Sequence, residues 1–277
     1  MEPEKGDKSI HVNVDDVCKA YLEVGAQPGD VIFMHGSLSS MGTVDGGPTT
    51  VFDGMLKAAS PNGTAAMPSL WFYQAGMYEK DFDVNTSPTY VGALGEAMRT
   101  DPRSLRSNHF SHAVAAIGAR AKELTSDHGA YGERPSPWSE KAFAECSPWT
   151  RLYQWNALYS FIGVTMRVCT MKHWVEGALV LHYLETVPVE RRQEARDYHL
   201  RKDCSDGVWP FYNNEELQKE LEKKGFIKKS KIGSATLTAC RIRPFVDLAI
   251  ETLLGDPERW LNPEFRQWID DLKQFRA

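Results

Sequence analysis

The hydrophobic positions along the chain switch between short apolar runs and stretches with helical spacing. Residues 14–24 carry apolar side chains at helical spacing, and the run VIFMH at 31–35 is typical of a buried strand. A loop, GSLSSMGTVDGG, follows, and a second helical stretch begins at Pro48, since proline fits the first turn of a helix. TAAMPS at 64–69 predicts another strand. The order of strand, loop, helix and strand predicts a right-handed parallel crossover.

The later segments continue this alternation of strands and helices. HAVAAIG (112–118) and ALYSFIGV (157–164) are strand candidates, and EELQKELEKKG (215–225) predicts a charged, solvated helix. The stretches at 70–88 and 129–140 are aromatic and irregular, or rich in Gly, Pro and Ser, so we expect loops around a site. The pattern predicts the α/β class, with one large domain as the default.

Composition and charge exclude several classes of protein. The 277 residues are 42% apolar and 25% charged, which is typical of a globular chain that buries a full core. A net charge of −5 argues against a nucleic-acid-binding surface and leaves room for a cationic small molecule. With no signal-peptide pattern and no apolar run of about 18 residues, we expect a cytoplasmic protein without a membrane partner. Five scattered cysteines without a CxxC pair predict reduced thiols.

One polar face stands out in a stretch that otherwise predicts a buried helix, CTMKHWVEGALV at residues 169–180. Thr170, His173 and Glu176 are three residues apart, so they share an arc of about 120° on one face of a helix. Buried polar groups need partners or line a cavity, and a core histidine satisfied by hydrogen bonds is the alternative to a functional site. Gly177, unfavourable inside a helix, predicts the close approach of another backbone or a ligand.

Two further segments are candidates for the same crevice. The loop after residues 31–35 could offer backbone N–H groups to a phosphate, but it matches neither GxGxxG nor the P-loop, and a tight turn is the alternative. His109 and His112 precede the strand candidate at 112–118. We interpret His112 as a strand residue that faces outward, which leaves His109 as the more open candidate.

Four segments, in this order, resemble the antibiotic N-acetyltransferase family, whose best-known members are the aminoglycoside 3-N-acetyltransferases. They are similar to the family's V-H-x-S-L-x-x-x-G and G-G-P pattern, its R-S-x-H-P motif ahead of a strand, its T-x-x-H-x-x-E signature and its closing segment. In this chain they read VIFMHGSLSSMGTVDGGP, RSNHFSHAVAAIG, CTMKHWVE and KIGSATLTACRIRPFVDLAIETLLGDPERWL. The resemblance spans about residues 10–262 and implies a single domain over 1–277, with a central mixed sheet flanked by helices.

The resemblance also implies an activity and a set of residues for it. An enzyme of this kind transfers the acetyl group of acetyl-CoA directly to a primary amine of a small molecule, without a metal or a covalent enzyme intermediate. His173 is the expected general base, because an imidazole with a pKa near 6.5 can take the proton that an alkylammonium must lose. Glu176 orients His173 or binds the acceptor, and Thr170 and His109 complete the catalytic set. The coenzyme contacts carried over are His35, Ser37, Leu38, Ser39, Gly42, Arg106 and Ser107.

On the acceptor side, this chain departs from what an enzyme for polycationic aminoglycosides leads one to expect. Aromatic residues lead the stretch LWFYQAGMYEK, so we expect a smaller amine than a full aminoglycoside, or one with a flat or apolar face. Phe110 also stands where the family has proline. The residues expected to contact the acceptor are Trp71, Tyr73, Glu79, Asp83 and Asp203.

Other functions stay open at this stage. The acceptor is an aminoglycoside-like antibiotic, with a role in antibiotic resistance, or a different amine of specialised metabolism, and the enzyme is a monomer or a homodimer. A metal-dependent hydrolase would use His109, His173 and Glu176 as ligands, although HxxE differs from the HExxH spacing of zinc sites. A family member that binds its ligands without turnover is a third hypothesis. A β-branched residue at Gly42 is expected to weaken coenzyme binding and leave the fold intact.

Overall fold

The computed structural model describes residues 4–71, 77, 79–201 and 208–276. Within these residues, one mixed sheet has seven strands, in the order β5 (Leu105–Arg106), β6 (Val114–Gly118), β4 (Thr64–Pro68), β2 (Val31–Gly36), β7 (Leu158–Ile162), β9 (Ala235–Arg241) and β8 (Lys228–Ile232). The central strand β2 pairs in parallel with β4 and β7, whereas β6 and β9 run antiparallel to those neighbours. The predicted α/β class, mixed sheet and parallel pairing are confirmed.

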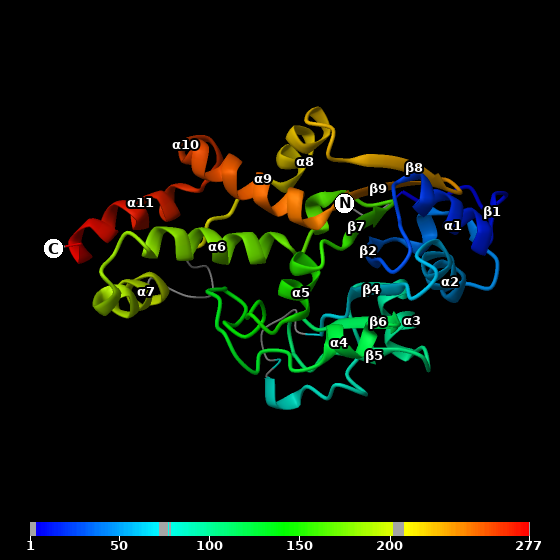
Figure 1. Cartoon of the computed structure of the whole chain (residues 1–277), viewed down its shortest axis with the longest axis horizontal. Helices are drawn as coiled ribbons and strands as arrows, with labels where there is room; N and C mark the ends of the chain where they lie inside the picture. The colour runs from blue at the N-terminus through cyan, green and yellow to red at the C-terminus, as the bar shows by residue number, and fades with distance from the viewer. Residues whose placement is uncertain (1–3, 72–76, 78, 202–207, 277) are drawn as a thin grey trace.

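Helices cover both faces of this sheet (Figure 1). The α-helices are α1 (Val14–Glu23), α2 (Pro48–Ala58), α3 (Ala93–Thr100), α4 (Ala121–Thr125), α5 (Pro148–Gln154), α6 (Lys172–Leu184), α7 (Arg192–Arg201), α8 (Asn214–Lys223), α9 (Ile242–Gly255), α10 (Pro257–Trp260) and α11 (Pro263–Asp271). Short 3-10 turns are η1 (Leu38–Ser40), η2 (Glu79–Asp81), η3 (Met166–Val168), η4 (Val189–Arg191) and η5 (Leu272–Phe275). A separate parallel pair joins β1 (His11–Val12) to β3 (Thr43–Val44).

Side chains of β2 alternate between two hydrophobic clusters, one on each face of the sheet. Ile32 and Met34 pack with α1, α2 and α3, whereas Val31 and Phe33 pack with α5, α6 and α9. Because successive strand residues point to opposite faces, His35 falls on the same face as Phe33. The predicted buried strand is confirmed. Because its side chains alternate between the two faces, His35 lies on the face of the sheet that packs against α6.

Local sequence signals account for where several helices begin. Asn13 caps α1 by accepting hydrogen bonds from the backbone N–H groups of Asp15 and Asp16, and the Asp16 side chain completes a capping box. Pro48 opens α2 in its first turn. Asn213 caps α8, the charged helix that the sequence predicts.

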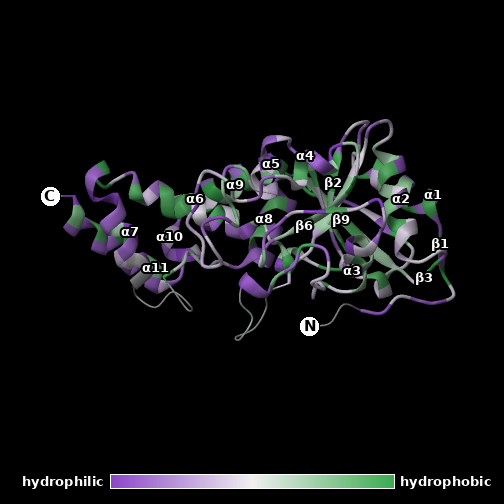
Figure 2. Ribbon diagram, turned by 90° about the horizontal axis from the view of Figure 1, so that it is seen from below, coloured by the Kyte–Doolittle hydropathy of each residue, from purple (hydrophilic) through white to green (hydrophobic). Residues whose placement is uncertain are grey.

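The molecule is elongated because α6 and α9 run side by side away from the sheet, toward α7, α10 and α11 (Figure 1). Apolar residues lie along the central strands, and hydrophilic residues along much of α7 (Figure 2). One of the two hydrophobic clusters continues from Phe33 in the sheet to Phe275 in η5. The buried part of α6 therefore belongs to the core, and only its first turn is free to line a site.

Candidate functional site

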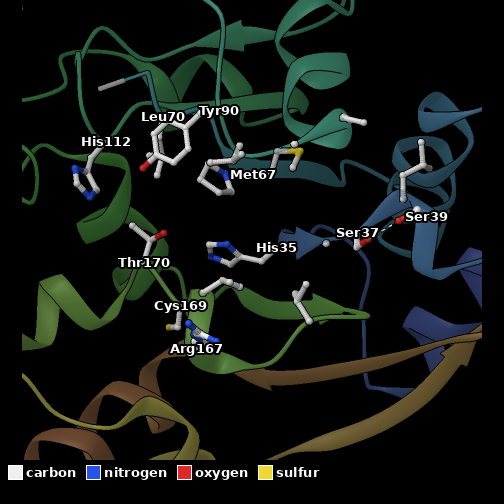
Figure 3. Close-up of a pocket in the computed structure, with 18 of the residues that line it drawn as sticks. His35, Ser37, Ser39, Met67, Leu70, Tyr90, His112, Arg167, Cys169 and Thr170 are labelled. Atoms are coloured by element: carbon white, nitrogen blue, oxygen red, sulfur yellow. Dashed lines mark hydrogen bonds between the residues drawn. The ribbon is translucent and has the colours of Figure 1, made fainter. Parts of the chain in front are cut away.

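A cavity of about 890 Å³ lies at the edge of the sheet where β2, β4 and β7 end (Figure 3). These three strands are parallel, so their carboxyl ends meet there, which is where α/β sheets commonly bind ligands. The lining residues come from the loop after β2, the end of β4, the segment before α3, two loop residues, η3 and the start of α6. They include Ser37, Leu38, Ser39, Gly42, Gly47, Met67, Leu70, Tyr90, His112, Trp138, Arg167, Thr170, Lys172 and His173.

His173 and Glu176 form a hydrogen-bonded pair in the first turns of α6. The Nδ1 atom of His173 lies 2.6 Å from Oε2 of Glu176, whose side chain is 0% exposed, while that of His173 is 17% exposed. A carboxylate only accepts hydrogen bonds, so Nδ1 carries the proton and Nε2 keeps its lone pair. His173 lines the cavity and Glu176 lies behind it.

Aromatic rings fix the position of the His173 imidazole. Its ring centroid lies 5.6 Å from that of His112, 5.6 Å from that of Trp138 and 6.0 Å from that of Phe143. Rings packed on several sides limit the rotation of the imidazole about its side-chain bonds. The pair therefore has a defined direction toward the cavity.

The outward orientation that we inferred for His112 is wrong. The strand β6 begins only at Val114, and His112 lies in the turn before it, where it is 5% exposed and lines the cavity. Its Nδ1 atom is 3.0 Å from Oγ of Ser111, and the indole N–H of Trp149 donates to its carbonyl oxygen. Burial, and next the nearby His173, hold the pKa of His112 well below its ordinary value, so this ring is neutral.

His35 connects the sheet to the start of α6. Its Nε2 atom lies 2.7 Å from the hydroxyl of Tyr159, which also accepts the backbone N–H of Met171 at 3.3 Å. Burial lowers the pKa of His35 to about 3, so the ring is neutral. Figure 3 shows His35 between Ser37 on one side and Thr170 on the other.

The loop after β2 has the geometry of a tight turn that faces the cavity. Ser37 donates its backbone N–H to the carbonyl oxygen of Ile162, and its Oγ lies 3.2 Å from that of Ser39. Gly42 has a φ of 106°, and a Cβ there would lie 2.6 Å from the carbonyl oxygen of Ile10. The expectation that a β-branched residue at this position leaves the fold intact is therefore wrong, because the loop backbone would have to move.

Arg106, Ser107 and His109 do not line this cavity. The guanidinium of Arg106 donates to the carbonyl oxygens of Ser69 and Ser87 at 2.7 and 2.6 Å. Oγ of Ser107 accepts the backbone N–H of Val114 and lies 2.9 Å from Nδ1 of His128. Nδ1 of His109 accepts the backbone N–H of His112 at 3.1 Å, and its ring stacks on that of His128, with the centroids 4.6 Å apart. These side chains hold the segment that presents His112.

The residues expected on the acceptor side are dispersed. Trp71 packs on Phe82 with ring centroids 5.7 Å apart, and it does not line the cavity. Glu79 and Asp83 are exposed, and Asp83 accepts the backbone N–H groups of two residues that follow it. Tyr73 and Asp203 lie outside the described residues.

The lining residues that the sequence analysis did not propose include the aromatic Tyr90 and Trp138 and the cationic Arg167 and Lys172. Trp138 belongs to a loop predicted to surround a site, and Lys172 stands inside the T-x-x-H spacing, so both had a local signal. The close approach predicted for Gly177 is confirmed, since a Cβ there would lie 2.5 Å from the carbonyl oxygen of Pro135. The loop that carries Trp138 thus packs directly on α6.

Neither a metal cluster nor a membrane-spanning helix is found among the described residues. Across the part of the chain that the structure describes, we find no group of three or more His, Cys, Asp or Glu side chains placed to hold a metal ion. None of the helices in that same part is both long and apolar enough to span a bilayer.

The chain is similar to known proteins in sequence and in structure. Residues 33–254 match the family model described as Aminoglycoside 3-N-acetyltransferase. The Aminoglycoside N(3)-acetyltransferase IV of Salmonella sp. is 26% identical over 248 residues, which cover 87% of each chain.

Among solved structures, the apoenzyme of aminoglycoside acetyltransferase AAC(3)-IVa aligns with a TM-score of 0.67 and 21% identity, over 95% of this chain and 98% of that one. The YokD protein from Bacillus subtilis aligns with a TM-score of 0.65 and 19% identity, over 94% and 96% of the two chains. AAC-IIIb in a binary complex with CoASH aligns with a TM-score of 0.64 and 18% identity, over 91% and 99%. These likenesses establish a shared fold.

Proposed function

Because the chain belongs to the aminoglycoside 3-N-acetyltransferase family, we propose that it transfers the acetyl group of acetyl-CoA to a primary amine of a small molecule. The observation that carries this proposal is the 2.6 Å hydrogen bond between Nδ1 of His173 and Oε2 of Glu176, with the imidazole at the cavity wall. This arrangement leaves Nε2 as the available base beside a space large enough for two ligands.

His173 is the general base of the proposed reaction. An alkylammonium first releases one proton to solvent and becomes the neutral amine. As the nitrogen of this amine attacks the thioester carbon, Nε2 of His173 takes the second proton, and the C–S bond breaks. The CoA thiolate that leaves can take this second proton from the imidazolium, which restores the neutral base. General-base assistance of this kind is worth about 10² to 10⁴ in rate.

Glu176 and Thr170 have different roles beside His173. Glu176 is fully buried and does not line the cavity, so its role is to orient the imidazole and stabilise the imidazolium rather than to bind the acceptor. Thr170, predicted on the same helical face, instead lies in the turn before α6 begins at Lys172. It lines the cavity there, and its hydroxyl can donate to the oxygen that becomes negative in the transition state.

The coenzyme occupies the side of the cavity formed by the loop after β2. Ser37, Leu38, Ser39 and Gly42 line it, and so does Gly47, which precedes the first turn of α2. The beginning of α2 lacks a side-chain cap, Pro48 has no N–H, and the N–H of Thr50 donates to the carbonyl oxygen of Gly47. The backbone N–H of Thr49 is therefore the donor in this first turn that suits a phosphate of acetyl-CoA. The relative AAC-IIIb crystallised with CoASH supports the choice of coenzyme. Arg106, Ser107 and His109 act by holding the segment before β6 that presents His112.

A thiol-release assay with acetyl-CoA and a panel of amines tests the proposal. We expect release that depends on both substrates, and a rise in melting temperature with acetyl-CoA alone, because a ligand that binds only the folded state stabilises it. If millimolar acetyl-CoA neither binds to the protein nor releases thiol, the assignment is refuted. Including gentamicin and kanamycin in the panel also tests the alternative acceptor, an aminoglycoside, and with it a role in antibiotic resistance.

A further inference from the structure

We propose that the acceptor amine carries an anionic group, and that Lys172 binds this group. The inference rests on the proposed function and narrows its substrate class. Lys172 is the residue immediately before His173, lines the cavity, and has a side chain that is 21% exposed. A ligand whose amine reaches His173 therefore has Lys172 as a neighbour.

The charges on the cavity wall favour an anion over a polycation. Among the described residues that line the cavity, Arg167 and Lys172 are cationic and none is a carboxylate. The acidic residues Glu79 and Asp83, expected near the acceptor, are exposed and lie off this wall. A ligand with several ammonium groups would bring like charges together here, which raises the free energy of the complex.

Among the described residues, the carboxylate that contacts the base is Glu176, which bonds His173 through one oxygen and has no hydrogen-bond partner at the other. Oε2 of Glu176 holds His173, and Oε1 lies 3.6 Å from Nζ of Lys172. Because Glu176 is fully buried behind these two side chains, an incoming ammonium group would have to displace Lys172 to reach it. Lys172 thus keeps a cationic acceptor away from Glu176.

Lys172 is held in place with its donors still available. Its Nζ lies 5.8 Å from the ring centroid of Phe211 and 5.6 Å from that of Tyr212, which is cation–π range. The 3.6 Å separation from Glu176 is longer than a hydrogen bond, and the ammonium makes none to a residue that the structure describes. An ammonium group has three N–H donors, so a carboxylate or phosphate oxygen can take a charge-assisted bond.

The position of these cations matches the acceptor rather than the coenzyme. In Figure 3, Arg167 and Thr170 lie on the opposite side of His35 from Ser37 and Ser39. Lys172 follows Thr170 by two residues and lies at the same end as the base. The coenzyme loop is at the other end of the cavity.

Matched pairs of amines that differ by one anionic group test the inference. The pairs are glucosamine 6-phosphate against glucosamine, and phenylalanine against phenylalaninamide. In the natural protein, we expect kcat/KM to be at least about 10-fold higher for the anionic member of at least one pair, as one charge-assisted hydrogen bond would give. Lys172→Met should reduce that ratio to within about threefold, and Lys172→Arg should keep most of it. Because the kcat/KM values of the anionic and the neutral amine are compared within one variant, any effect of the substitution on His173 changes both values equally and cancels in their ratio.

The control is Lys122→Met, which removes an exposed cation on α4, away from the cavity, and should leave the ratio unchanged. Lys172→Gln is a second variant, should Lys172→Met fold poorly. If neutral amines or gentamicin have a higher kcat/KM than the anionic amines, the inference is overturned and the acetyltransferase function stands. A ratio that survives in both Lys172→Met and Lys172→Gln also overturns it. If no amine releases thiol from acetyl-CoA, the proposed function itself fails.

Discussion

At the residue scale, the position of one proton decides what His173 can do. Glu176 accepts the Nδ1 proton and is buried, so the lone pair of Nε2 is the one available to a ligand in the cavity. His112 and His35 also line the cavity, but burial lowers the pKa of each well below 6.5. Neither has a carboxylate partner among the described residues. Of these three histidines, only His173 has the hydrogen-bonded carboxylate that orients a general base.

His173→Ala is therefore expected to lower kcat by about 10² or more, with little change in the affinity for acetyl-CoA. Steady-state kinetics give the first quantity and titration calorimetry the second. The limb of the pH profile of kcat/KM that reports this base should vanish in the variant. Retained activity in His173→Ala, with a loss in His109→Ala, would move the base to the loop before β6.

Glu176→Gln should act on kcat rather than on the KM of the acceptor, because Glu176 lies outside the cavity lining. An amide keeps an oxygen that can accept the Nδ1 proton but loses the charge that stabilises an imidazolium. We expect kcat to fall by about 10-fold or more, but by less than in His173→Ala. A variant with unchanged kcat and a raised acceptor KM would instead make Glu176 an acceptor-binding residue.

At the element scale, a structural feature could be predicted from the sequence when the residues that determine it lie within one segment. The strand at 31–35, the helix from Pro48 and the helix over 215–225 could be predicted because the pattern of apolar and polar residues that indicates each lies within the segment. The shared face of His173 and Glu176 could be predicted for the same reason, since their spacing within α6 determines it. The orientation of His112 could not, because it depends on a strand that begins two residues later than its sequence pattern indicates.

The acceptor side was the least predictable part of the site because it is assembled from distant segments. Tyr90, Trp138 and Lys172 line one cavity only after the segment before α3, the loop over 129–140 and α6 have packed together. Aromatic residues near Trp71 indicated an apolar surface, but Trp71 itself packs on Phe82 instead. The composition of a loop predicts that it lies at a site, whereas tertiary packing decides which of its side chains enter.

Gly177 connects two of these segments and gives a prediction at this scale. In an ordinary helix, Gly→Ala stabilises by about 1 kcal/mol. A Cβ at Gly177 would lie 2.5 Å from the carbonyl oxygen of Pro135, and overpacking of this kind costs about 1–3 kcal/mol. We therefore expect Gly177→Ala to lower the free energy of unfolding, and to lower kcat by displacing the loop of Trp138.

The matched control is Gly255→Ala at the end of α9, where a Cβ would meet nothing within 4 Å. Chemical denaturation should show this control to be neutral or stabilising. If the two substitutions change the free energy of unfolding equally, the loop over 129–140 moves to accommodate the new methyl group without loss of stability.

At the scale of the whole molecule, several histidines are buried as neutral rings. Burial is the largest cause that lowers the pKa of His35 to about 3, of His109 to about 2 and of His128 to about 4. His35 and His109 are buried, and the half-buried His128 lies within hydrogen-bond distance of Ser107 and the carbonyl oxygen of Ala142, so protonation would place a charge where little water reaches it. The fold is therefore linked to pH through groups that have no role as the base.

This linkage predicts that stability falls as the pH drops below about 6.5, the ordinary pKa of histidine. Above that pH neither state binds the proton, and stability is constant. Below it the unfolded chain binds protons first, and each buried histidine removes up to about 1.4 kcal/mol per pH unit until its own folded pKa is reached. Ion-paired carboxylates such as Asp101, whose pKa Arg103 holds below the usual value, add their loss only below about pH 4.

Urea denaturation between pH 7.5 and 5 isolates the contribution of the histidines. The free energy of unfolding should decrease steadily over this interval, and His128→Gln should flatten the slope, since glutamine cannot bind the proton. His182→Gln, at an exposed position on α6, is the matched control for the substitution itself. A constant free energy of unfolding from pH 7.5 to 5 would mean that these rings reach water or a counter-charge before the chain unfolds, and that the core around them is not dry.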